Sequence, residues 1–180
     1  MYNNLKIQNT RILNNVLGFW GSIFSNFHIH NFKYENIWFP SSEHAFMWKK
    51  ADYFQDNEAK DLILSTKLPR KAKEYGLKVK NFNEKEWTKV SYQFMVEILM
   101  EKFSQSKSLT DSLLSTKDLV IVEGSPFDKK WGVGIHWEED ACYDQTKWKG
   151  QNLLGKALME VRETLKNKAL EKYFPTKESS

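Results

Sequence analysis

The sequence has little cysteine and no long apolar run, and each shortage excludes a class of protein. The single cysteine, Cys142, has no partner for an intrachain disulfide, so a disulfide-stapled fold is excluded. No apolar run approaches the roughly 20 residues of a membrane-spanning helix. Residues 1–12 are also too polar for a secretory signal. We therefore expect a cytoplasmic protein with no membrane partner.

The signatures of bound nucleotides and metals are missing as well. The chain has neither a phosphate-binding P-loop nor the glycine fingerprint of dinucleotide-binding folds. His28 and His30 fall on one face of an expected strand, but no cysteine or carboxylate accompanies them at ligand spacing. We therefore expect neither a metal nor a cofactor, and we interpret the two histidines as surface or packed residues.

A block of like charge is the remaining absence. The 27 basic and 23 acidic residues are spread along the chain, which permits anionic small molecules or nucleic acid as partners without requiring them. A length of 180 residues is enough for one domain with a real core, and we expect a single domain over residues 1–168 followed by a charged tail over 169–180. Aromatic residues make up 14% of the chain, more than a core of this size needs, which suggests a stacking pocket.

One stretch places an acid and an amine on the same expected helix face. Pro40 ends an extended run, and the hydroxyls of Ser41 and Ser42 suit an N-cap, so a helix is predicted from about Ser42 to about Phe54. Side chains three, four and seven positions apart share a helix face. That face carries Glu43, Phe46, Met47 and Lys50.

The chemistry of this face has two interpretations. In the first turn, free N–H groups and the helix dipole favour a carboxylate, so Glu43 is expected to be ionised at neutral pH. Taken alone, Glu43 would then only stabilise the helix start, and Lys50 would be a solvated charge. A functional role for the pair depends on the rest of the chain.

Two loops and one long helix supply further candidates. Residues 18–27 and 125–134 are rich in turn residues and aromatics, which is typical of ordered loops that line sites. The second loop contains Asp128, whose carboxylate would more often accept backbone hydrogen bonds than catalyse, and Trp131. The helix expected over residues 84–103 carries Trp87 at its edge, where the ring could be shared between core and pocket.

The other expected elements follow from periodicity and turn signals. Glu35 and Asn36 predict a two-residue hairpin turn, and the final helix should begin near Asn152. The polar and aromatic segment 135–149 shows no clear element and is interpreted as a lid. In the helix over 84–103, one core-facing stripe is expected, with the members Trp87, Val90, Phe94, Ile98 and Glu101.

Taken together, several motifs in this order and spacing resemble the NADAR family, also called the YbiA-like family. The resemblance covers about residues 18–165, nearly the whole chain. The motifs are Phe-Ser-Asn-Phe at 24–27, Pro-Ser-Ser-Glu-His-Ala-Phe at 40–46 with Lys50, Ser-Pro-x-Asp-x-x-Trp-Gly-x-Gly at 125–134, Gly-x-Asn-x-Leu-Gly at 150–155 and Leu-Met-x-Val-Arg at 158–162.

The resemblance implies a single α+β domain, mostly helical with a small β-sheet, and N-glycosidase activity. Members of the family are linked to hydrolysis of ribosylamino-pyrimidine phosphate intermediates of riboflavin synthesis and to removal of ADP-ribose from guanine bases. The expected partner is therefore a nucleotide-like small molecule or an ADP-ribosylated nucleic acid, bound by a monomer or small oligomer. A non-catalytic module that binds ADP-ribose is the alternative.

The resemblance also assigns site residues. Glu43 would stabilise positive charge on the sugar or activate water, and Lys50 would be the family's lysine, able to attack C1 as a Schiff-base nucleophile. Asp128 would protonate the departing base or hold a sugar hydroxyl. The expected substrate-binding residues are Asn26 and Asn152, which would hydrogen-bond ribose or phosphate, Trp87 and Trp131, which would stack on the base, and Phe27 and Gly132 from the same motifs.

Overall fold

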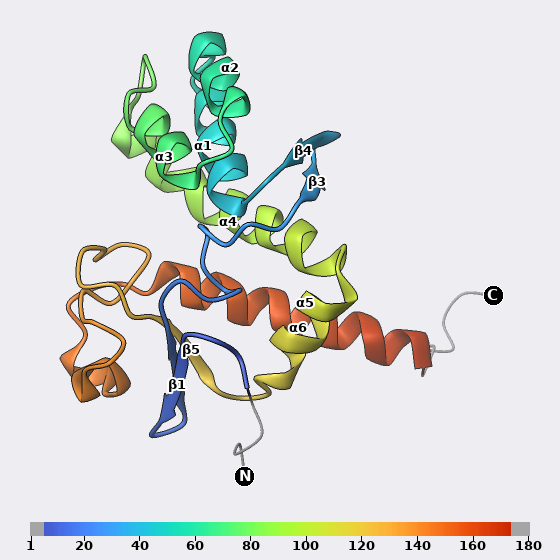
Figure 1. Ribbon diagram of the computed structural model, residues 1–180, viewed down its shortest axis with the longest axis vertical. Helices are drawn as coiled ribbons and strands as arrows, with labels where there is room; N and C mark the ends of the chain where they lie inside the picture. Colours follow the sequence, from blue (N-terminus) through green and yellow to red (C-terminus); the bar gives the residue numbers. More distant parts are fainter. Residues whose placement is uncertain (1–5, 174–180) are drawn as a thin grey trace.

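Six α-helices and two small sheets make up the part of the chain, residues 6–173, that the computed structural model describes (Figure 1). This is the expected α+β domain, mostly helical with little sheet. In chain order the elements are β1 (Thr10–Leu13), β2 (Val16–Phe19), β3 (Phe32–Tyr34), β4 (Ile37–Phe39), α1 (Ser42–Tyr53), α2 (Asn57–Ser65), α3 (Pro69–Leu77), α4 (Glu84–Ser104), α5 (Lys107–Ser115), β5 (Val120–Glu123), the 3-10 turns η1 (Asp140–Tyr143) and η2 (Gln145–Lys147), and α6 (Leu153–Tyr173).

The larger sheet joins strands that are far apart in the sequence. Its order is β1-β2-β5, with β2 antiparallel to β1 and parallel to β5. In the parallel pair Phe19 lies opposite Glu123, so both strands end at the same edge. The two loops expected to line a site leave from these carboxyl ends. Carboxyl ends of parallel strands are a common location for ligand sites.

The second sheet is the hairpin predicted at Glu35 and Asn36. These two residues have φ values of 48° and 65°, the left-handed conformation that a tight two-residue turn between strands requires. The hairpin leads directly into α1, where the side chain of Ser41 accepts a hydrogen bond from the backbone N–H of His44. Both the turn and the helix start at Ser42 are confirmed.

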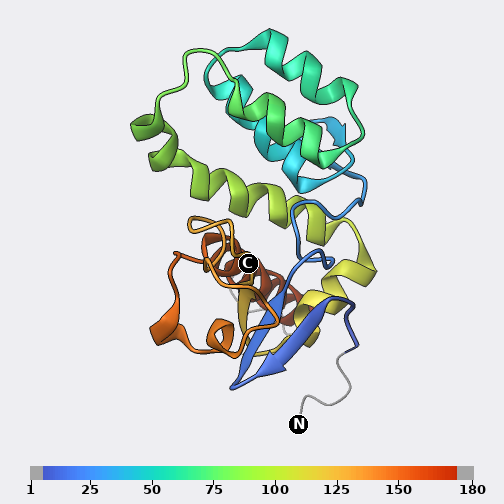
Figure 2. The ribbon, with the colours of Figure 1, turned by 60° about the vertical axis from the view of Figure 1, so that its left-hand side comes forward.

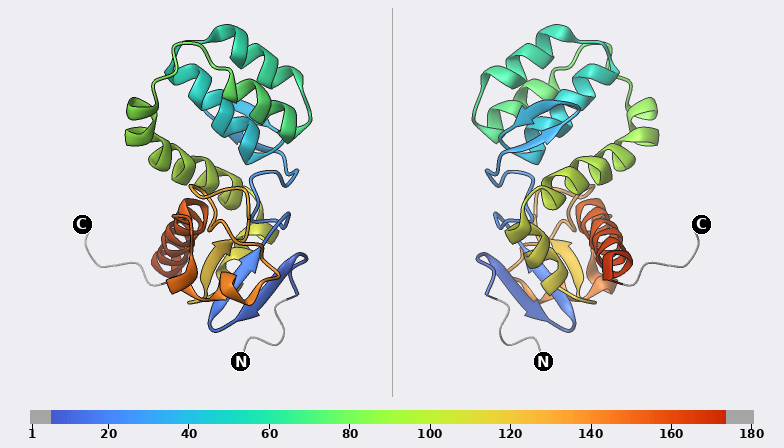
Figure 3. Two further views of the ribbon diagram at one scale, coloured as in Figure 1. Left: turned by 90° about the vertical axis from the view of Figure 1, so that its left-hand side faces the viewer. Right: turned by 90° about the vertical axis from the view of Figure 1, so that its right-hand side faces the viewer.

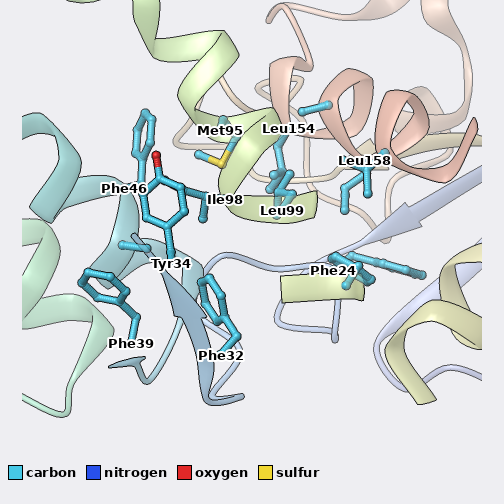
Figure 4. Packing of buried hydrophobic residues seen from close by; sticks show 14 of the residues in the cluster. Phe24, Phe32, Tyr34, Phe39, Phe46, Met95, Ile98, Leu99, Leu154 and Leu158 are labelled. Carbon is cyan, nitrogen blue, oxygen red and sulfur yellow. The ribbon is translucent and has the colours of Figure 1, made fainter. Parts of the chain in front are cut away.

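The elements form two layers with α4 between them (Figures 2 and 3). Helices α1, α2 and α3 pack together on one side of α4, and α6 with the larger sheet lies on the other. Figure 4 shows the core running through both layers, from Phe39 and Phe46 past Met95 to Leu158. A pocket between the layers can therefore draw residues from both.

The position of α4 explains one wrong prediction. Helix α4 contacts α1 on one side and α6 on another, so it buries more than a single stripe. Trp87 and Ile98 are buried as expected, but Glu101 is exposed. The buried positions that the stripe missed are Ser91, Met95, Leu99, Lys102 and Phe103.

The segment 135–149 is not a lid. It forms the turns η1 and η2, and its side chains Cys142 and Tyr143 pack with Val16 and Val122 of the larger sheet in a second, smaller core cluster. The Tyr143 hydroxyl donates to the carbonyl of Trp137 at 2.6 Å, which closes the segment on itself. Polar composition suggested mobility here, but buried aromatics fix the segment to the sheet.

The end of the chain differs from the expected tail. Helix α6 continues through Tyr173, beyond the domain boundary predicted at residue 168. Residues 174–180 of that tail, like residues 1–5, lie outside the described part. Among the residues that the structure describes, no helix has both the length and the apolar character needed to cross a membrane.

Candidate active site

A cavity of about 400 Å³ opens between the two layers. Helices α1, α3 and α4 form one side, and the loops after β2 and β5 form the other, as Figure 2 lets the reader follow. The residues that line it are Asn26, Phe27, Glu43, Phe46, Met47, Lys50, Lys73, Leu77, Trp87, Met95, Glu123, Phe127, Asp128, Lys129, Lys130 and Trp131.

The helix face predicted for α1 is the wall of this cavity. Glu43, Phe46, Met47 and Lys50 all line it, as their spacing indicated. The first turn is held in place by the loop before β3, because the Asn26 carbonyl accepts the backbone N–H of Glu43 at 2.9 Å. The loop and the helix start therefore position Asn26 and Glu43 side by side.

A buried lysine that the sequence did not reveal ties this loop to α1. Lys102 of α4 is fully buried, and its ammonium donates to the carbonyls of Ile23 (3.2 Å) and Ser25 (3.0 Å) and to the Ser42 hydroxyl (3.4 Å). Burial lowers the pKa of Lys102 to about 7. Its donors satisfy backbone groups that a chain without regular structure would otherwise leave unpaired.

The expected ionised state of Glu43 is wrong at neutral pH. Its side chain is 5% exposed, and no group in the described residues donates a hydrogen bond to its carboxylate. Burial raises the pKa of Glu43 to about 7, opposed by the charge of Lys73 and reinforced by Asp128. Loss of hydration therefore outweighs the helix dipole, whose effect is worth less than about 1 kcal/mol in most settings.

Glu123 is the site residue that sequence reasoning missed. It ends β5, and its carboxyl group enters the same cavity as Glu43. Burial, then the charges of Asp128 and Glu43, raise the pKa of Glu123 to about 8. The available signal was a glutamate at the end of an otherwise apolar strand, just before a turn-rich loop. Two protonatable carboxyl groups thus share one pocket.

Lys50 lies at the α3 end of the cavity and is only 6% exposed. Its Nζ donates to the carbonyl oxygen of Gly76 at 2.8 Å and lies 3.9 Å from the ring centroid of Phe82. Burial, and then the charge of Lys130, lower the pKa of Lys50. Gly76, expected only as a helix end, brings its carbonyl this close because an added Cβ would collide with the Met47 side chain.

Asp128 lines the cavity but is held by its own loop. Its Oδ1 accepts backbone N–H groups from Lys130 (2.9 Å), Trp131 (2.7 Å) and Gly132 (3.4 Å). This is the local backbone acceptor that the turn sequence favoured. The carboxylate fixes the loop that carries Trp131, which limits its freedom to move a proton.

The aromatic side chains form one joined wall. Phe46 lies between two tryptophans, with its ring centroid 5.2 Å from that of Trp87 and 5.1 Å from that of Trp131. Trp87 is shared between core and pocket as predicted, but further rings pack around it and leave it 6% exposed. Phe27, at the opposite rim, is 39% exposed. A ligand ring therefore meets more free aromatic surface at the rim than at Trp87.

Asn26 is the one predicted asparagine that the structure places at the cavity. Its side chain is 8% exposed, and Oδ1 is buried with no hydrogen-bond partner in the described chain. A buried polar atom without a partner is costly, and a ligand hydroxyl would satisfy it. The geometry therefore suits the expected contact with ribose.

The predictions for Asn152 and Gly132 as substrate-binding residues are wrong. Asn152 is fully buried outside the cavity, where its Nδ2 donates to the Ile121 carbonyl at 2.9 Å and its Oδ1 accepts the Glu123 N–H at 3.2 Å. Gly132 is absent from the cavity wall because its N–H and carbonyl face Asp128 and Asn152. Both residues hold β5 and the 125–134 loop together.

This correction predicts a stability defect for Asn152→Ala. The change leaves two buried backbone groups of β5 unpaired and puts alanine at a φ of 53°, so we expect a loss of roughly 3 kcal/mol in the free energy of unfolding. Denaturant unfolding measures it. An unchanged stability with a raised KM would instead support a contact to substrate.

Charge is unevenly distributed around the cavity. Lys73, Lys129 and Lys130 line it in addition to Lys50, and none of these three was expected as a site residue. Four ammonium groups suit a substrate with phosphate groups. In the described residues, no cluster of three or more histidine, cysteine, aspartate or glutamate side chains could hold a metal ion.

Comparisons with known proteins agree with these observations. The NADAR domain model matches residues 18–166. The N-glycosidase R617 of Acanthamoeba polyphaga mimivirus is 38% identical over 125 residues, covering 69% of this chain and 74% of that protein. Protein irg-1 of Caenorhabditis elegans is 37% identical over 129 residues, covering 71% of this chain but only 61% of its own length.

A solved structure extends the match to the fold. The NMR structure of the Escherichia coli protein YbiA superposes with a TM-score of 0.73 at 30% identity, covering 91% of this chain and 92% of that one. In sequence, Escherichia coli YbiA, named an N-glycosidase, is 34% identical over 142 residues, covering 79% of this chain and 80% of that protein. The chain therefore belongs to the NADAR family, together with these N-glycosidases, which are hydrolases that act on N-glycosyl bonds.

Proposed function

We propose that this protein is an N-glycosidase that hydrolyses the bond between C1 of a ribosyl group and the nitrogen of a base. The preferred substrate is an ADP-ribosylated guanine in nucleic acid, and the second candidate is a ribosylamino-pyrimidine phosphate of riboflavin synthesis. The observation that carries this proposal is one cavity in which two buried carboxyl groups, Glu43 and Glu123, meet the buried amine of Lys50.

Glu43 suits the charge that develops during this reaction. Cleavage of a ribosyl C–N bond leaves positive charge on the sugar ring, and a fixed carboxylate beside C1 stabilises it or activates the attacking water. The pKa of about 7 means that the carboxylate is available near neutral pH. Its position in the first turn of α1, held by the Asn26 carbonyl, provides the fixed geometry.

Two roles fit Lys50. As a nucleophile, its neutral amine forms a bond to C1 while the C1–N bond to the base breaks and the sugar ring opens. One water then hydrolyses the resulting imine to the free sugar and returns the amine. As a charged group, Lys50 would instead hold a substrate phosphate. The lowered pKa and the buried position favour the nucleophile.

The departing base needs a proton, and Glu123 is better placed to give it than Asp128. Asp128 spends Oδ1 on three backbone N–H groups, whereas the Glu123 carboxyl accepts none from the described chain. Two carboxyl groups with separated pKa values divide the work of acid and base. Glu123, with its pKa of about 8, keeps the proton at the pH where Glu43 has begun to ionise.

This division predicts a distinctive pH profile. Turnover should fall above about pH 8, as Glu123 loses its proton, and Glu123→Gln should lower kcat roughly 10²-fold and abolish that fall. Asp128→Asn, which keeps a carbonyl oxygen for the backbone N–H groups, should retain most of the turnover and the same alkaline fall. If Asp128→Asn abolishes the alkaline fall, Asp128 is the acid.

The substrate is tested by offering both candidates to the wild-type protein. We expect release of ADP-ribose from an ADP-ribosylated guanine oligonucleotide, weakening as salt rises because the lysines contact phosphates. Turnover of the ribosylamino-pyrimidine phosphate alone would assign the protein to the second substrate. Tight binding of ADP-ribose without turnover of either would leave a binding module and contradict the proposal.

A further inference from the structure

A second cavity of about 380 Å³ adjoins the first and has no role in the mechanism described so far. The shared wall consists of Phe27, Lys73, Glu123, Phe127 and Asp128, which line both cavities. The second cavity, here called the side compartment, adds Trp20, Gly21, Ser25 and Ser125 to these shared residues. It therefore begins where the carboxyl groups of the first cavity end.

Exposed aromatic rings surround the side compartment. Phe127 is 86% exposed, Phe27 39% and Trp20 36%, although large apolar side chains usually avoid water. The rings of Trp20 and Phe127 lie 6.1 Å apart at 70°, and His136 packs 5.0 Å from Trp20 on edge. Trp20 thus has a supported position, and a planar ligand could stack where water now contacts these rings.

The two cavities differ in charge. Lys50, Lys73, Lys129 and Lys130 line the first cavity, whereas the side compartment has only Lys73, which the two share. A substrate half that carries phosphates therefore fits the first cavity, and an uncharged planar half fits the side compartment. The two tryptophans of the first cavity offer less free surface, since Trp87 is already covered by neighbouring rings.

We propose that the side compartment holds the planar base released by hydrolysis, stacked against Trp20 and Phe127, while the ribosyl phosphate half occupies the first cavity. This inference rests on the proposed function and adds the place of the leaving group. It puts the C1–N bond at the shared wall, where Glu123 can protonate the base as it departs. The base-stacking role expected for Trp87 and Trp131 thereby moves to Trp20 and Phe127.

Equilibrium binding of the two product halves tests the inference without turnover. Guanosine, an uncharged mimic of the leaving group, and ADP-ribose are titrated separately, with the dissociation constant measured by NMR. Trp20→Ala and Phe127→Ala should each weaken guanosine binding by about 5- to 100-fold, the usual effect of removing a stacking ring. Both should leave ADP-ribose binding within about twofold.

Two further variants serve as controls. Trp20→Phe keeps an aromatic ring and should retain most of the guanosine affinity, whereas Trp38→Ala removes a tryptophan that is 65% exposed on β4, outside both cavities, and should change nothing. Loss of ADP-ribose affinity with guanosine unaffected would give the compartment to the adenosine half and overturn the inference. Unchanged guanosine binding in both alanine variants would also overturn it.

The test separates this inference from the proposed function. Wild type that binds ADP-ribose but not guanosine would refute the side compartment as a base site and leave the N-glycosidase proposal standing. Wild type that binds neither probe would count against the proposed substrate and, with it, against the compartment.

Discussion

Glu43→Gln should lower kcat/KM by about 10²- to 10⁴-fold with little change in fold. Glutamine keeps the shape of the side chain but has no negative charge to stabilise a positively charged sugar ring, and removal of one fixed electrostatic group commonly costs this much. The side chain makes no hydrogen bond to the described chain that the change would break. Steady-state kinetics with the ADP-ribosylated guanine oligonucleotide measure the effect.

The same variant should also become more stable than wild type as the pH rises. Because burial raises the pKa of Glu43 from 4.5 in the unfolded chain to about 7, the folded protein holds a proton that the unfolded chain has lost. Wild type therefore loses stability as pH rises through this window, by at most about 3 kcal/mol, and glutamine does not. A stability difference that is the same at pH 5 and pH 8 would refute the buried, protonated state of Glu43.

Lys50→Ala should remove turnover almost completely, by a factor of roughly 10³ or more, because loss of a nucleophile leaves only binding and charge stabilisation. Borohydride distinguishes the two roles of this lysine. If the amine forms an imine with the opened sugar, reduction of the C=N bond should attach the ADP-ribosyl group to wild-type protein through a stable amine. Mass spectrometry should find this adduct on Lys50.

Matched variants guard the interpretation of this result. Lys50→Met keeps the apolar stem above Phe82 and tests whether lost packing explains the defect of alanine. Lys49→Ala removes the neighbouring lysine, which pairs with Glu35 outside both cavities, and should leave turnover near wild type. Full turnover in Lys50→Met would exclude any role for the amine. Lost turnover without an adduct in wild type would assign Lys50 to electrostatic binding.

Local signals predicted much of the fold because local geometry decides those features. The hairpin at Glu35 and Asn36 and the helix start at Ser42 depend on turn and cap residues that lie next to each other in sequence. The shared face of Glu43 and Lys50 depends only on helical spacing. The same reasoning correctly placed Trp87 between core and pocket.

The features that the sequence did not predict depend on contacts between distant segments. Glu123 joins the site because β5 pairs with β2, about one hundred residues earlier in the chain. Asn152 was assigned to substrate because its two hydrogen bonds to β5 require the fold to be known. The protonation of Glu43 likewise depends on burial, which helix position alone does not give.

The most direct test of the central claim measures release of free ADP-ribose from an ADP-ribosylated guanine oligonucleotide by wild type, Glu43→Gln and Lys50→Ala side by side. Thermal unfolding of each sample shows that the variants are folded. The account predicts release by wild type and almost none by either variant. Release by both folded variants at the wild-type rate would place the chemistry outside this cavity and contradict the account.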